Sequence, residues 1–78
     1  MDRLATRLRD CFHIVFPDLP VQQIPSATQS SVAAWDSAMS ILLVNVIEDE
    51  FGIHVDLDRL DDLDSFERIR QYLSVEAG

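Results

Sequence analysis

The stretch of chain between Asp36 and Gly52 constrains the fold most, because it carries two helix-end signals with a helical apolar pattern between them. Asp36 is a residue type that caps the first turn of a helix, and Gly52 is the type that adopts the left-handed conformation after the last turn. Apolar residues recur between them at the intervals of one helix face. The residues expected on this buried face are Ala38, Ile41, Val44 or Leu43, Ile47 and Phe51. The sequence therefore predicts a helix over residues 37–51.

Two further amphipathic helices are predicted, one near each end of the chain. In residues 2–15 an apolar row opposes a charged one, and Pro17 ends the segment because proline disfavours the helical conformation of the residue before it. The buried row consists of Leu4, Leu8, Phe12 and Val15, with Cys11 beside them. In residues 65–74, Asp64 followed by Glu67 fits the pattern of a capping box. The buried row there is Phe66, Ile69 and Leu73, with Tyr72 flanking it.

A long connector joins the first two helices. Residues 17–35 contain all three prolines of the chain and a polar run over 26–31. A connector this long is uncommon in a small domain unless it is functional or anchored. The side chains expected to anchor it on the core are Leu19, Val21, Ile24, Val32 and Trp35. The shorter connection after the second helix is predicted to be extended over 53–55 and to form one helical turn over 57–61.

These elements predict an all-α fold, a small four-helix bundle with three main helices and a short third helix. No strand alternation and no internal repeat is visible in the sequence. With 78 residues, the chain is expected to form a single domain over residues 1–78. A domain of this size buries only about 60% of the surface that its unfolded chain exposes, which leaves little room for a deep catalytic cleft.

The chain is acidic, with 14 acidic residues, six arginines, no lysine and a net charge of −8. Residues 1–16 sum to +1 and residues 17–78 to −9, so the excess lies after the first helix. Such a field repels nucleic acids and anionic membranes and attracts basic protein surfaces, although acidity that serves only solubility gives the same composition. The longest apolar run, over 41–44, is too short to span a bilayer, and the N-terminus lacks the apolar run of a signal peptide. We expect a cytoplasmic monomer without a membrane span that binds other proteins and no nucleic acid.

Residues with catalytic or metal-binding chemistry are sparse. Cys11, the only cysteine, lies in an apolar row and is predicted to be a buried thiol. The two histidines, His13 and His54, have no accompanying cluster of metal ligands. The acids of residues 56–67 do not fit a calcium-binding EF-hand loop, because the position that needs glycine holds Asp61. We therefore predict no enzyme and no metal site, and we interpret the acidic run as a solvated face; a weak, exposed divalent-cation site is the alternative.

One serine stands in an informative context. Ser37 follows Asp36, ends the long connector and begins a helix whose last turns carry the acidic run Glu48-Asp49-Glu50. A serine at the start of a helix is normally only part of a cap. A group esterified to Ser37 would project from an exposed junction, and a phosphodiester there would lie near unpaired backbone N–H groups at the positive end of the helix dipole.

These residues resemble the acyl carrier protein family. Asp36-Ser37-Ala38 stands where the family has its attachment signature, Asp-Ser-Leu, and Glu48-Asp49-Glu50-Phe51 follows at the family's spacing. The resemblance covers nearly the whole chain and is weak in residues 1–30. It continues through Ile53, Val55, Phe66, Ile69 and Tyr72-Leu73.

The resemblance implies a left-handed four-helix bundle with a 4'-phosphopantetheine arm on Ser37. A separate phosphopantetheinyl transferase, using magnesium, would transfer the arm from coenzyme A to the hydroxyl that follows Asp36. The terminal thiol of the arm would then hold acyl groups as thioesters and present them to several enzymes. In many members of this family the interior of the bundle shelters the acyl chain.

The positions that differ from the family pattern bear on the pathway. Ala38 replaces the usual leucine, and Met39 and Leu42 occupy outward positions of the second helix that partner enzymes of this family read. With Glu48 and Asp49, these two residues are predicted to contact acyl-loading and acyl-transfer enzymes through basic and apolar docking surfaces. The pattern favours a specialised lipid, polyketide or related biosynthetic pathway over general fatty-acid synthesis. The alternatives are an aminoacyl or peptidyl carrier and an unmodified helical interaction module.

Overall fold

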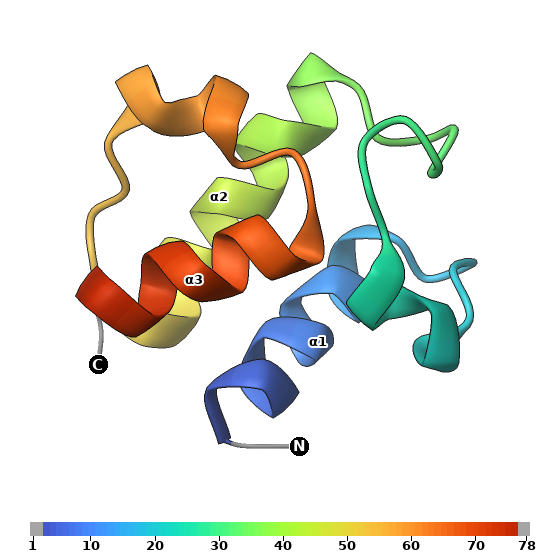
Figure 1. The fold of residues 1–78 in the computed structure, drawn as a ribbon, viewed down its shortest axis with the longest axis horizontal. Coiled ribbons are helices and arrows are strands. Elements are labelled where there is room, and N and C mark those ends of the chain that lie inside the picture. The colour runs from blue at the N-terminus through green and yellow to red at the C-terminus, as the bar shows by residue number, and fades with distance from the viewer. Residues whose placement is uncertain (1–2, 77–78) are drawn as a thin grey trace.

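The first helix, α1, spans Arg3–Val15 in the computed structural model, which describes residues 3–76 (Figure 1). Asp2, the predicted first residue of this helix, lies outside the described residues. The Phe16 N–H still donates to the Phe12 carbonyl, at 2.7 Å, before Pro17 diverts the chain. The prediction of an amphipathic helix is confirmed, with Ala5 more deeply buried than Leu4. Its buried residues are Ala5, Leu8, Cys11, Phe12 and Val15.

The helix α2 spans Ser37–Phe51, and both of its predicted caps are confirmed. The Asp36 carboxylate accepts a hydrogen bond from the Met39 N–H at 2.9 Å, which satisfies one of the unpaired donors of the first turn. At the other end, Gly52 has φ = 66°, a conformation that costs glycine little, and its N–H donates to the Glu48 carbonyl.

The predicted buried face of α2 is wrong in its first half. Ala38 and Ile41 are exposed, because the helix is turned so that other side chains meet the core. This segment is apolar on almost every side, so apolar spacing alone does not orient it. Contacts with α1 and with Trp35 fix the orientation instead. The buried residues of α2 are Ser40, Leu43, Val44 and Ile47.

The long connector contains a 3-10 helix, η1, over Val21–Ser26, which the sequence pattern did not predict. A six-residue helix with proline inside it has too little apolar periodicity to be recognised. Ile24 and Trp35 anchor the connector in the core as predicted, and Leu19 and Val32 pack against the core from its edge. Val21 is 43% exposed, so its predicted anchoring role is wrong.

The last two elements are the 3-10 helix η2 over Leu57–Asp62 and the helix α3 over Phe66–Glu76. The predicted helical turn and C-terminal helix are thus confirmed, but the predicted cap of α3 is displaced by one residue. The Ser65 hydroxyl, not the Asp64 carboxylate, accepts from the Arg68 N–H at 3.1 Å. Asp64 and Glu67 instead make ion pairs with Arg68 and Arg70.

The arrangement is an all-α bundle built on α1. This helix contacts α2, α3 and η1, while Figure 1 shows η1 and η2 on opposite sides of the bundle. Residues 3–76 contain no strand; their only extended pairing is a single bridge between Thr28 and Ser65. That bridge ties the connector to the start of α3, because the Phe66 N–H also donates to the Ala27 carbonyl.

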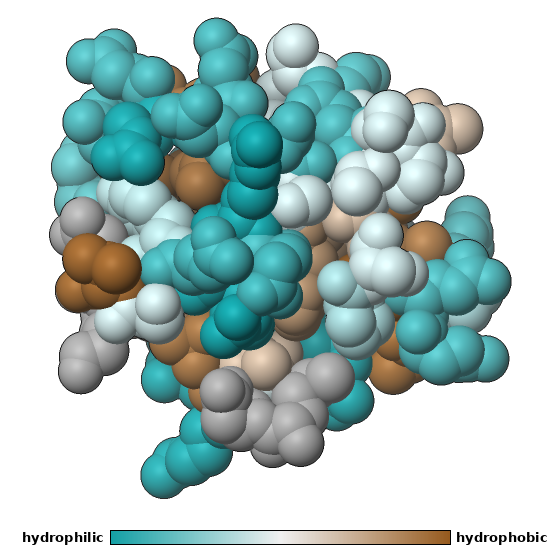
Figure 2. All heavy atoms as spheres, viewed as in Figure 1, coloured by the Kyte–Doolittle hydropathy of each residue, from teal (hydrophilic) through white to brown (hydrophobic). Residues whose placement is uncertain are grey.

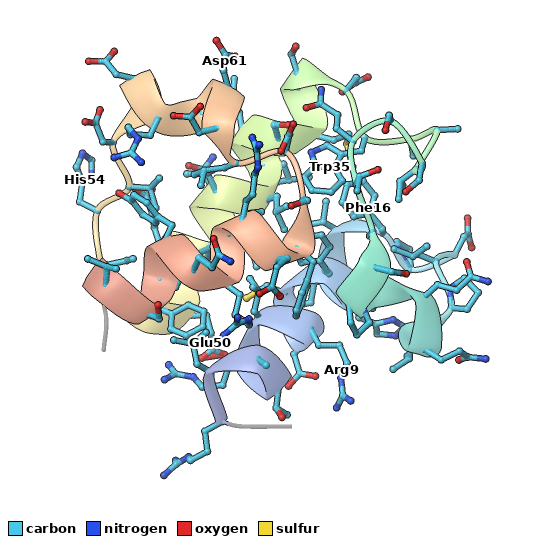
Figure 3. All side chains as sticks on the ribbon, in the orientation of Figure 1. Arg9, Phe16, Trp35, Glu50, His54 and Asp61 are labelled. Carbon is cyan, nitrogen blue, oxygen red and sulfur yellow. The ribbon has the colours of Figure 1, made fainter. Side chains whose placement is uncertain are left out.

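Four aromatic rings fill the centre of the core. The Phe12 ring lies 6.1 Å from Phe16, 5.4 Å from Trp35 and 5.3 Å from Phe66, measured between ring centroids. The rings of Phe16 and Trp35, both labelled in Figure 3, are tilted by 43° with their centroids 5.7 Å apart. Their tilted and edge-on geometries are the favoured ones for aromatic pairs. The aromatic cluster therefore joins α1, α3 and the connector that precedes α2.

The surface is mainly hydrophilic on the face shown in Figure 2, with hydrophobic atoms in small, separated areas. Within residues 3–76, the helices are too short and too polar for any of them to cross a membrane. The prediction that this chain has no spanning helix is confirmed for that part.

Candidate functional site

Ser37 is the first residue of α2, and its side chain is exposed. Two residues earlier, Trp35 is 3% exposed, and its indole N–H donates to the Ser40 hydroxyl at 2.7 Å. The Ser40 N–H donates to the Asp36 carbonyl at 2.9 Å. The junction is therefore fixed from the inside by a buried hydrogen bond and from the outside by the Asp36 cap, and it presents the Ser37 hydroxyl to solvent.

An open hollow adjoins this serine, between the starts of α2 and α3 and the middle of the connector; we name it the Ser37 hollow. Its lining residues are Thr28, Gln29, Ser30, Trp35, Asp36, Ser37, Asp64, Ser65 and Arg68. Most of the lining consists of hydroxyl, amide and carboxylate groups, and Arg68 supplies its single guanidinium. A polar group bonded to Ser37 would therefore lie in a polar environment without entering the core.

No basic side chain of the described residues forms a hydrogen bond with Ser37. His13 is exposed on α1, and His54 follows the opposite end of α2, about 20 Å along a helix of this length. The His54 imidazole lies beside Glu48 instead, with 3.3 Å between Nδ1 and the carboxylate.

The predicted partner-binding residues near Ser37 differ in their surroundings. Leu42 is 46% exposed, as expected of a contact residue, and Ile41 beside it is 47% exposed. Met39, however, is half-buried and packs against the core, so its expected outward placement is wrong. The helix is turned so that Ile41, rather than Met39, accompanies Leu42 on the outer face.

Ile14 belongs to the same apolar surface and was missed. It is 67% exposed on α1 and lines a shallow hollow with Asn45, Val46 and Asp49 of α2. Leu42 and Val46 are neighbours on α2 at a spacing of four, so the apolar surface continues from α2 to α1. The exposure of Ile14 could have been predicted from its spacing in the sequence. It lies on the same side of the helix as Arg3, Arg7 and Asp10, which face away from the core.

The acidic run at the end of α2 divides into two structural acids and one unpaired acid. The Glu48 carboxylate accepts from the Val55 N–H at 2.7 Å and is half-buried, so it fixes the chain after Gly52. Glu50 pairs with Arg7, at 3.2 Å, whose guanidinium also lies 4.5 Å from the centre of the Phe51 ring. Asp49 is exposed like Glu50, but among the described residues it has no ion pair and no side-chain hydrogen bond.

The acids of residues 56–67 are spread along η2 and the start of α3. The Asp56 carboxylate accepts from the Asp58 N–H at 3.0 Å, and Asp62 lies 3.4 Å from Arg59. The hydrogen bond from Arg70 holds the pKa of Glu67 below its ordinary value. No three cysteine, histidine or acidic side chains in the described part of the chain are grouped closely enough to hold a metal ion.

The single cysteine is buried as predicted. Cys11 is 1% exposed, and its pKa is raised to about 11 because burial disfavours the thiolate and the carboxylates of Glu50 and Asp10 repel it. A thiol in this state is a poor nucleophile at neutral pH.

Comparisons of this chain with protein-family models, with curated proteins and with solved structures gave no match.

Proposed function

We propose that this protein carries acyl groups as thioesters on a 4'-phosphopantetheine arm attached to Ser37. The observation that supports the proposal best is the junction at Ser37. An exposed hydroxyl follows a helix-capping aspartate, Asp36, at the start of an α-helix, beside a polar hollow. The length, the order of the helices and the short helical segment η2 also agree with an acyl-carrier-protein-like bundle.

The attachment reaction requires little of this chain beyond position. The Ser37 oxygen attacks the phosphorus nearest the pantetheine in coenzyme A, and the bond from that phosphorus to the nucleotide phosphate breaks. The serine proton passes to a base of the transferase, and adenosine 3',5'-bisphosphate leaves. Magnesium bound with the transferase would neutralise the phosphate charge. The chain's own task is to expose the hydroxyl on a well-positioned backbone, and the buried Trp35–Ser40 hydrogen bond supports the helix start on which Ser37 lies.

The partner surface that we propose consists of Ile41, Leu42, Val46 and Asp49 of α2 with Ile14 of α1. An exposed apolar strip with an unpaired carboxylate at one end fits enzymes that present an apolar patch beside basic side chains. Met39 and Glu48 contribute by supporting this surface, since both are engaged with the rest of the bundle. We propose a cytoplasmic, monomeric carrier that serves a specialised lipid, polyketide or related biosynthetic pathway.

Intact-mass measurement tests the proposal. The protein is incubated with coenzyme A, magnesium and a broad-specificity phosphopantetheinyl transferase, and the expected result is a gain of one phosphopantetheine. Ser37→Ala should gain nothing, while Ser74→Ala, which removes another exposed serine, should be modified like the parent protein. Absence of the gain with several transferases, with helicity intact by circular dichroism, would overturn the proposal.

An unmodified helical interaction module is the second candidate, and the exposed strip of Ile14, Ile41 and Leu42 favours it independently of Ser37. Such a surface can bind a partner without any arm. The two functions differ in one outcome. Binding of a partner to Leu42 that is unaffected by Ser37→Ala, together with no mass gain, supports the second candidate.

A further inference from the structure

An apolar hollow lies between the end of α1 and the connector; we name it the connector groove. Two limbs of the connector, residues 17–20 and 31–34, form its walls, and the buried Val15 and Phe16 form its floor. The groove measures about 420 Å³, which falls within the range of about 300–1,000 Å³ that small-molecule sites occupy. Its apolar lining residues include Val15, Phe16, Leu19, Val32, Ala33 and Ala34.

The lining of the connector groove differs in chemistry from that of the Ser37 hollow. Of the residues that line the groove, Asp18 alone is charged, and no basic side chain is among them. The Ser37 hollow is lined mainly by hydroxyl, amide and charged groups. An aliphatic chain gains free energy when it leaves water for the groove, whereas a carboxylate would lose its hydration and be repelled by Asp18. The ligand that fits the groove is therefore an uncharged aliphatic chain.

The connector groove is close to Ser37 along the chain. Ala34, which lines the groove, comes three residues before Ser37, so their Cα atoms are no more than about 11 Å apart. Ala34 and Asp36 are both exposed, so the surface between the groove and the serine is open on the outside. An arm that reaches the active sites of other enzymes, as in the proposed function, spans this distance.

Entry into the bundle core beside Ser37 would disturb more contacts than entry into the groove. The Trp35 ring is 3% exposed, and its centroid lies 5.4 Å from Phe12 and 5.7 Å from Phe16. A chain that entered there would separate these rings and break the hydrogen bond from Trp35 to Ser40. In the groove, a chain would contact Phe16 from the side of the connector and leave the aromatic cluster in place.

The two limbs of the connector can separate to admit a chain. Each limb has its own backbone hydrogen bonds, such as Leu19 N–H to the Phe16 carbonyl at 3.1 Å and Trp35 N–H to the Val32 carbonyl at 3.0 Å. Among the described residues, no backbone hydrogen bond crosses from one limb to the other. Leu19 and Val32 are half-buried at the edge of the core, so they can move apart without the loss of a backbone hydrogen bond.

We infer that the connector groove binds the aliphatic chain of the acyl group carried on Ser37, outside the bundle core. The chain lies along Leu19, Val32 and Ala33. This inference rests on the proposed function and adds its substrate class, acyl groups whose chain ends without a charge. It differs from shelter of the chain inside the bundle, because the packing between Phe12 and Trp35 stays intact.

Two acyl groups that differ only in chain length provide the test. The transferase loads Ser37 from octanoyl-coenzyme A or from acetyl-coenzyme A, and the gain in intact mass verifies loading. Nuclear Overhauser contacts are then recorded from the isotope-labelled octanoyl chain. Contacts with the Leu19 and Val32 side chains are expected, and the signals of these residues should shift further in the octanoyl form than in the acetyl form. Contacts with Phe66 and Ile69 in the core instead, or no contact with the protein, would overturn the inference.

A matched pair of variants tests the groove itself. Ala33→Glu adds a charge to the groove at an exposed position, so it should abolish the octanoyl contacts while helicity by circular dichroism is unchanged. Gln22→Glu adds the same charge to the same connector outside the groove and should preserve the contacts. Contacts that persist in Ala33→Glu would also overturn the inference.

The gain in mass separates this inference from the proposed function. Any of the contrary results above leaves the proposed function standing, because the acyl group was loaded. Failure of the parent protein to load either group would overturn the proposed function and this inference with it.

Discussion

The two ends of α2 are held in place by different kinds of contact, although both are properly capped. At the serine end, Trp35 is buried, packs edge-on against Phe12 and donates to the Ser40 hydroxyl. At the glycine end, the contacts are made mostly by charged groups at the surface, such as Arg7 with Glu50. Buried contacts resist salt and solvent, whereas exposed ion pairs are screened and contribute little. The end that presents Ser37 is therefore the more rigidly fixed of the two.

Removal of the buried tryptophan should have the largest effect. Trp35→Ala takes away the ring that fills the space under the serine junction and leaves Ser40 without its donor. We expect the free energy of unfolding to fall by about 3–5 kcal/mol, measured by urea denaturation. Arg7→Ala at the opposite end is the control and should cost no more than about 1 kcal/mol. Similar losses in the two variants would contradict the difference between the ends.

The buried thiol beneath the glycine end should make stability depend on alkaline pH. The pKa of Cys11 is raised from 9.0 to about 11 in the folded protein. Above pH 9 the unfolded chain releases this proton first, so the stability should fall as pH rises from about 9 to 11. The expected loss is on the order of 2 kcal/mol relative to Cys11→Ala, measured by denaturation at each pH. Parallel pH profiles for the two proteins would show that burial does not disfavour the thiolate.

Two glutamate substitutions test which apolar residues at the serine end of α2 pack against the core and which lie on the surface. Met39→Glu places a charge against the core, so we expect a loss of about 1–2 kcal/mol in stability. Leu42→Glu should change stability by less than about 0.5 kcal/mol, because Leu42 is half-exposed. Thermal denaturation of both variants checks the prediction. Equal stability of the two would mean that Met39 also lies on the outer face.

The smallest predicted change in stability comes from substitution of Glu48 or Asp49, two adjacent acids at the glycine end of α2. Glu48→Ala removes the acceptor of the Val55 N–H and should cost about 1 kcal/mol. Asp49→Ala should be nearly neutral for stability and should instead weaken binding to a basic partner enzyme, which titration calorimetry can measure at low and high salt. Equal effects of the two substitutions on stability would show that the hydrogen bond between the Glu48 carboxylate and the Val55 N–H does not stabilise the fold.

The sequence predicted the parts of this molecule that depend on local signals. The bounds of α2 follow from Asp36 and Gly52, whose side-chain and backbone preferences act within one turn. The exposure of Ser37 follows from the same signals, because the residue after an N-cap stands at the free end of a helix.

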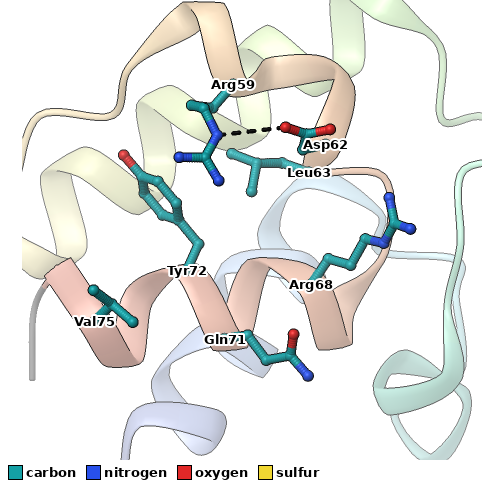
Figure 4. Close-up of a pocket in the computed structure, with 7 residues that line it drawn as sticks. All are labelled: Arg59, Asp62, Leu63, Arg68, Gln71, Tyr72 and Val75. Carbon is teal, nitrogen blue, oxygen red and sulfur yellow. Dashed lines mark hydrogen bonds and ion pairs between the residues drawn. The ribbon is translucent and has the colours of Figure 1, made fainter.

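Features that depend on tertiary contacts were not predictable in the same way. Contacts with Trp35 and α1 set the rotation of α2 about its axis. Met39, expected on the surface, therefore packs against the core, and Ile41, expected in the core, is exposed. The binding of Glu48 to the Val55 N–H depends on how the chain folds back after Gly52. The hollow between η2 and α3, lined in part by Arg59 and Tyr72 (Figure 4), joins residues from two elements whose approach no apolar periodicity predicts.

The burial of Cys11 has a consequence for the function that we propose, in which Ser37 bears an arm with a thioester. A thioester passes readily to any accessible thiolate, so a second reactive thiol on the same chain would divert the cargo by self-acylation. Cys11 is 1% exposed with a pKa of about 11, and so it offers neither access nor an appreciable thiolate fraction near neutral pH. In the modified protein, the arm would therefore hold the one sulfur atom from which, and to which, an acyl group moves.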